Sequence, residues 1–169
     1  MRRLICSSVR SADWRRGLAM RAMRLLRPMV PSSRLLPDGR TLRTVQAPHH
    51  VKNADGTWVV SSAAFSPSSS DKSLSVDLEQ LLHADDLAST ALYPELARSV
   101  GLYALGVGEL RQLGMDVDHR PIWQNWYHGG VQNISHSLRK KMAKRAVAVI
   151  EIDQVAAASY QTHGLVVET

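Results

Sequence analysis

The sequence has few of the residues that would place it in a specialised class of protein. It contains one cysteine, Cys6, which excludes an intramolecular disulfide and leaves no cysteine-based zinc site. Its uncharged runs are broken by Ser and Gly, so none supplies the ~20 apolar residues that span a bilayer. With 44% hydrophobic and 21% charged residues it is neither fibrous nor generally disordered. We therefore expect a cytoplasmic globular protein without a transmembrane segment.

The positive charge of the chain is concentrated at its N-terminal end. Residues 1–44 hold eleven Arg and no Lys against two acids, whereas residues 45–169 hold ten Lys and Arg against thirteen acids. The formal net charge of +6 therefore comes from the first segment, and the remainder is slightly acidic.

The stretch from Trp14 to Met29 has the spacing of a basic amphipathic helix. At 100° per residue its apolar side chains fall within an arc of about 80°, with arginines over the remainder. This apolar stripe consists of Trp14, Leu18, Ala22, Leu25 and Met29. Such a helix is compatible with binding to lipid or phosphate, with a transit peptide, and with docking on the following domain. An upstream extension, with translation starting at Met20 or Met23, is an equally open interpretation.

The pattern after this helix predicts a single compact α+β domain, built from short strands and hairpins plus two or three helices. Residues 31–44 are rich in turn-forming residues, so we divide the chain into an Arg-rich helix and linker (1–43) and the α+β domain (44–169). Asn53–Gly56 predicts the turn of a β-hairpin, and Leu74–Leu78 alternates like a half-buried strand.

Further elements are predicted from local spacing. A helix capped by Asp85 and Asp86 is expected next, followed by a buried strand over 102–107 and a helical turn ended by Gly114. A strand then leads to His119, and Gly129 with Gly130 predicts a turn. A basic helix over 138–146, capped by Ser137, and a strand over 147–152 complete the domain.

One part of the sequence is similar to other proteins. The string SSAAFSPSSSDKSLSVD over 61–77, with HHV before it and GVGELRQLGMDV after it, resembles small uncharacterised bacterial cytoplasmic proteins. The resemblance covers about two-thirds of the chain and implies a cytoplasmic bacterial domain. It implies no particular chemistry.

Histidines provide one functional hypothesis. His128 precedes two glycines, where a backbone can approach a ligand closely, and His136 precedes a cationic helix whose N-terminus suits a phosphate. In a ribonuclease-type enzyme, such as the toxin of a toxin–antitoxin pair, they would act as base and acid, with Lys140 stabilising charge. His119, His128 and His136 are spaced at nine and eight residues, without the helical pairing typical of a zinc site. No metal or other cofactor is expected.

The second hypothesis, which we favour, is a small binding or interaction protein without catalytic activity. Its partner would be an acidic protein or a nucleic acid, engaged by cations of the helix near residue 140 with two tryptophans beside them. The candidate binding residues are Trp123, Trp126, Arg139, Lys140, Lys141, Lys144 and Arg145. The residues alone leave open whether the protein is an enzyme and what its oligomeric state is.

Overall fold

A computed structural model describes residues 27–93 and 100–151 of the chain. The strands are β1 (Arg40–Gln46), β2 (His50–Lys52), β3 (Trp58–Val60), β4 (Leu74–Leu78), β5 (Val100–Gly106), β6 (Asp116–His119), β7 (His128–Gln132) and β8 (Val147–Ile150). The helices are α2 (Glu79–Ala84), α3 (Val107–Gln112) and α4 (His136–Arg145), with short 3₁₀ turns η1 (Ser32–Arg34), η2 (Ala47–His49) and η3 (Ser62–Phe65). This mixture confirms the predicted α+β class.

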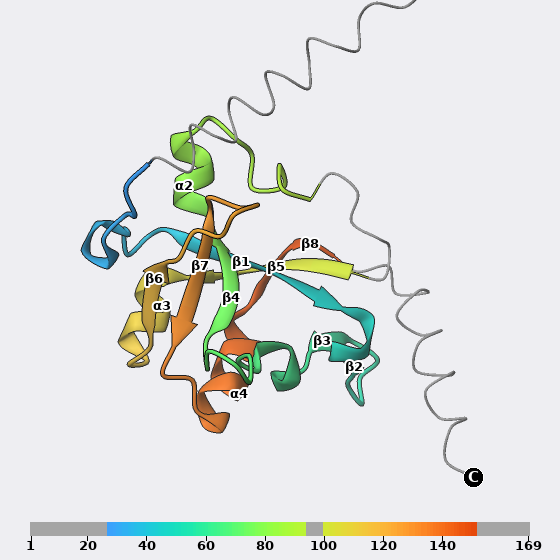
Figure 1. Ribbon diagram of the computed structural model, residues 1–169. Helices are drawn as coiled ribbons and strands as arrows, with labels where there is room; N and C mark the ends of the chain where they lie inside the picture. Colours follow the sequence, from blue (N-terminus) through green and yellow to red (C-terminus); the bar gives the residue numbers. More distant parts are fainter. Residues whose placement is uncertain (1–26, 94–99, 152–169) are drawn as a thin grey trace, which may run out of the picture.

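Six of the strands form one antiparallel sheet in the order β6-β7-β4-β1-β5-β8, and β2 and β3 form a separate hairpin (Figure 1). The predicted hairpin is therefore confirmed, with Gly56 at φ +87° in its turn, where a side chain would be strained. Strand β4 shows the expected alternation, because Leu74, Val76 and Leu78 are buried. Helix α4 and turn η3 pack on one another at one end of the sheet.

The central strand β1 begins before the domain boundary that we placed at residue 44. It starts at Arg40 and pairs along its whole length with β5, and both Leu35 and Leu42 lie in the core. Arg111 of α3 secures the preceding turn by donating hydrogen bonds to the carbonyl oxygens of Ser32 and Leu35. The turn-forming residues of this stretch therefore form a bend in the chain and not a linker between domains. The leucines beside them are buried in the core.

The prediction of a helix after Asp85 is wrong for the residues that the structure describes. Helix α2 instead precedes this position, Asp85 is its C-cap, and Asp86 adopts φ +56°. Residues 87–93 contain turns and no helix, whereas 94–99 lie outside the described residues. The apolar spacing of this stretch has another cause, because Leu87 and Leu92 pack from the turns against the core.

The turn predicted at Gly129 is also wrong, since Gly129 and Gly130 lie inside strand β7. A Cβ atom on Gly129 would approach the carbonyl oxygen of Asp118 to 2.8 Å and the side chain of Leu78 to 3.0 Å. The glycines therefore permit a close approach of neighbouring strands and do not supply a turn.

The N-terminal helix falls almost wholly outside the described residues. Its expected last residues, 27–29, are described and are not helical. Pro28 accounts for this locally, because the residue before a proline is disfavoured in helical conformation. Among the described helices, none has the length and apolar character needed to cross a membrane.

Candidate functional site

Helix α4 presents the cationic surface that the sequence predicted, although its cap lies two residues earlier than expected. Ser135, not Ser137, is the N-cap, and its hydroxyl oxygen accepts a hydrogen bond from the amide of Leu138 at 3.3 Å. Met142 is fully buried, and Leu138 and Ala146 pack on the same core. This apolar stripe fixes which side of α4 faces solvent.

Four of the predicted binding residues lie on the solvent-facing side of α4. They are Lys140, Lys141, Lys144 and Arg145, all exposed. None of them forms an ion pair within the described part of the chain, and α4 contains no acidic residue. We call these four residues the α4 basic face. Their charges are consequently not neutralised by neighbouring side chains.

Arg139 and His136 behave differently from these four cations. The Arg139 guanidinium donates a hydrogen bond to the Ser66 hydroxyl at 2.7 Å and another to Nδ1 of His136 at 2.9 Å. Arg139 is half-buried and links α4 to the residue after η3. It therefore has a structural contact that the α4 basic face lacks.

The two candidate catalytic histidines lie at different ends of one strand. His128 is the first residue of β7, and its Nδ1 atom lies 2.7 Å from the carbonyl oxygen of Arg120. His136 follows the end of β7 and begins α4, beside Lys140. Five strand residues span about 13 Å from first to last, so β7 separates the two imidazoles. The geometry does not bring them to a common scissile bond.

The aromatic cluster lies with His128 and not with the α4 basic face. It belongs to the segment joining β6 to β7, which precedes β7, whereas α4 follows it at the other end (Figure 1). Trp123 is 79% exposed, Trp126 is half-buried and Tyr127 is buried. The structure therefore separates the two tryptophans from the cations beside which we expected them.

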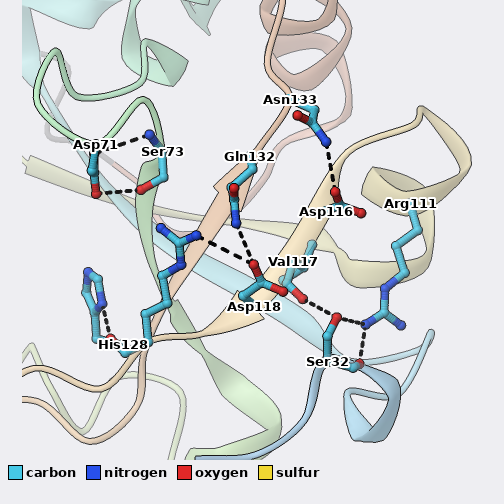
Figure 2. Close-up of polar contacts among 11 residues, drawn as sticks. Ser32, Asp71, Ser73, Arg111, Asp116, Val117, Asp118, His128, Gln132 and Asn133 are labelled. Carbon is cyan, nitrogen blue, oxygen red and sulfur yellow. Dashed lines mark hydrogen bonds and ion pairs between the residues drawn. The ribbon is translucent and has the colours of Figure 1, made fainter.

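At both ends of β7 the polar side chains form partnered networks. Asp77 accepts hydrogen bonds from the amide of Asn125 at 2.6 Å and from the hydroxyl of Tyr93. At the other end of β7, Gln132 donates to Asp118 of β6, and Asn133, the residue after β7, donates to Asp116 of β6 (Figure 2). These carboxylates accept hydrogen bonds from neutral amide and hydroxyl groups, as structural networks commonly do, and Asp118 also forms an ion pair with Arg120 at 3.7 Å.

One histidine, considered from the sequence only for its spacing in a possible zinc site, has a well-defined structural role. His119 is 1% exposed, and its Nδ1 accepts a hydrogen bond from the amide of Val30 at 2.9 Å. Its Nε2 must then carry the proton and donate to the carbonyl oxygen of Trp126 at 2.6 Å. Burial lowers the pKa of His119, partly offset by the bond to Trp126. The available signal was its place on the buried side of an alternating strand.

A second buried histidine, His50, has a similar environment in the hairpin. Its ring nitrogens contact the carbonyl oxygen of Gln46 at 3.1 Å and the hydroxyl of Tyr103 at 2.9 Å. Burial lowers the pKa of His50 and raises that of Tyr103. Both groups are therefore favoured in their neutral forms.

The described residues contain no group of three His, Cys, Asp or Glu side chains placed to hold a metal ion. Comparisons of the chain with protein-family models, curated proteins and solved structures find no match. The fold and the sites described above are thus the basis for a functional proposal.

Proposed function

We propose that this protein is a small nucleic-acid-binding protein that contacts the phosphate backbone through the α4 basic face. The observation that carries the proposal is the set of four exposed cations without ion-pair partners among the described residues. They lie on a helix held to the core by buried Met142. A rigid helix that displays unneutralised cations suits phosphate, whose binding releases counterions.

The composition of this face favours nucleic acid over an acidic protein. Protein interfaces usually have an apolar or aromatic centre that supplies much of the binding energy. The α4 basic face consists of cations, and Trp123 and Trp126 are at the other end of β7. With no aromatic ring on the face for bases to stack on, we expect backbone contacts that do not depend on base sequence.

The proposal is tested by measuring the affinity of the full chain for a labelled 20-bp DNA duplex by fluorescence anisotropy. If four phosphates are contacted, the affinity should fall about 100-fold between 50 and 200 mM salt. Lys140→Glu combined with Lys144→Glu should weaken binding strongly and make the salt dependence less steep. A salt-independent affinity, or no binding at low salt, would contradict the proposal.

Two matched variants identify where the binding energy arises. Arg34→Glu with Lys52→Glu makes the same change in charge at exposed positions outside α4, so it should reduce affinity much less. Arg15→Glu with Arg16→Glu tests the N-terminal segment. If only this last variant weakens binding, the N-terminal arginines are the binding element and the α4 proposal is wrong. Tighter binding of polyglutamate than of the duplex would instead indicate an acidic protein partner.

A further inference from the structure

A groove of about 460 Å³ lies beside the aromatic segment before β7, away from α4. Several of the side chains that line it are apolar and exposed: Trp123 (79%), Met29 (59%) and Ile122 (51%). Leu92 and Trp126 also line the groove. Contiguous exposed apolar surface of this kind usually marks a place where another segment or molecule binds.

Two of the polar side chains that line the groove are already engaged within the protein. The Asn125 amide donates to Asp77, and its oxygen accepts a hydrogen bond from the amide of Tyr127 at 3.0 Å. Arg27 forms an ion pair with Asp85 at 2.9 Å. Besides the exposed Gln124, the side chains that the groove leaves open to a ligand are therefore the apolar and aromatic ones.

The chain enters the described structure at the wall of this groove. Arg27, the first described residue, and Met29 both line it. The Arg27–Asp85 ion pair holds the point of entry, and the amide of Val30 donates to His119, whose other nitrogen contacts the carbonyl of Trp126. These contacts fix residues 27–30 next to Trp126.

We propose that residues 14–26 occupy this groove, with their apolar stripe against Trp123 and Ile122. Leu25, the last stripe residue of this segment, is two positions from Arg27, and Ala22 and Leu18 follow at helical spacing. Because the segment is covalently joined to the wall of the groove, its effective concentration there is in the millimolar range that short tethers give. This favours the same chain over a second copy as the occupant.

The test is amide hydrogen exchange of the full chain, read by mass spectrometry. In the wild-type protein, residues 14–26 should be protected. Leu18→Asp places a charge in the stripe and should lower that protection about tenfold or more, since the apolar contact of a buried leucine is lost. Exchange in residues 121–127 should rise as well.

Met20→Asp is the matched control, because Met20 lies about 160° from the middle of the stripe on the same expected helix. It should leave protection in both regions largely unchanged. The reciprocal variant, Trp123→Ser, changes an exposed side chain and should raise exchange in residues 14–26 while the sheet stays protected.

Three outcomes would overturn the proposal. The first is absence of protection in residues 14–26 of the wild type. The second is an equal effect of Leu18→Asp and Met20→Asp, which would indicate a loss of helix without docking. The third is protection that rises with protein concentration together with a dimeric mass in light scattering, which would identify a second copy as the occupant.

Discussion

Replacement of His119 by Phe tests the structural role of the most enclosed histidine in the β6–β7 region. Phe retains an aromatic ring but removes both hydrogen bonds, so the amide of Val30 and the carbonyl of Trp126 lose their partner. A buried group left unpaired costs about 1–3 kcal/mol. Because Val30 and Trp126 are half-buried, water relieves part of this cost, and we expect a total of about 2–3 kcal/mol. For a chain of this size the melting temperature should fall by roughly 5–10 °C.

The same side chain predicts how stability depends on pH. The pKa of His119 is lowered by burial, so the folded protein holds it neutral where the unfolded chain would take up a proton. Its contribution is complete above about pH 6.5 and is lost as the pH falls from there through the lower native pKa. His50, whose pKa is also lowered by burial, acts with the same sign, so His119→Phe should reduce the pH dependence without abolishing it.

The assay is thermal unfolding followed by circular dichroism between pH 8 and pH 5. His136→Phe is the control: His136 is exposed, and the hydrogen bond it accepts from Arg139 is also exposed, so the change should alter stability by about 0.5 kcal/mol or less. An unchanged melting temperature for His119→Phe at pH 7.5 would refute the role assigned to the two hydrogen bonds. A wild-type melting temperature independent of pH in this range would refute the protonation argument.

Two further predictions concern the packing of the sheet and the ion pair between Arg40 of β1 and Glu79 of α2. Gly129→Ala should lower the free energy of unfolding in a denaturant melt by about 2 kcal/mol or more, because its Cβ would lie 2.8 Å from the backbone oxygen of Asp118. Gly130→Ala should lower it less, because its Cβ would meet the flexible Arg120 side chain. Equal losses for the two variants would contradict this reasoning. Burial raises the pKa of Glu79, but its bonds to Arg40 and Ser89 outweigh this and lower it, so stability is lost as the pH falls below about 4.5. Glu79→Gln should lose about 1–2 kcal/mol at pH 7 and flatten that acid dependence, and an unaltered acid transition would exclude Glu79 as its source.

Only part of the candidate site could be predicted from the sequence, as α4 and His128 show. The cationic side of α4 was predictable, because Leu138 and Met142 are four residues apart and set the buried side, which places Lys140 and Lys144 on the opposite side. The separation of His128 and Trp123 from this helix was not predictable. It arises because β7 begins at His128 and runs away from both residues before the chain reaches α4. Residues close in sequence were separated by a single extended strand.

Elements with local signals could be predicted from the residues alone. Alternation gave strand β4, Asp55 with Gly56 set the hairpin turn, and Gly114 at φ +82° ended the turn after α3 as predicted. Each of these features depends on the intrinsic backbone preferences and polarity of neighbouring residues.

Contacts between residues that are distant in the sequence became visible only in the folded structure. Val30 and His119 are 89 positions apart in the sequence, and Arg27 and Asp85 are 58 apart. The contacts within these pairs nevertheless hold residues 27–30 beside the groove lined by Trp123. The role of Gly129 likewise depends on Asp118 and Leu78 in neighbouring strands. No local pattern encodes such contacts, because they arise when strands from separate parts of the chain pair and bury their shared face.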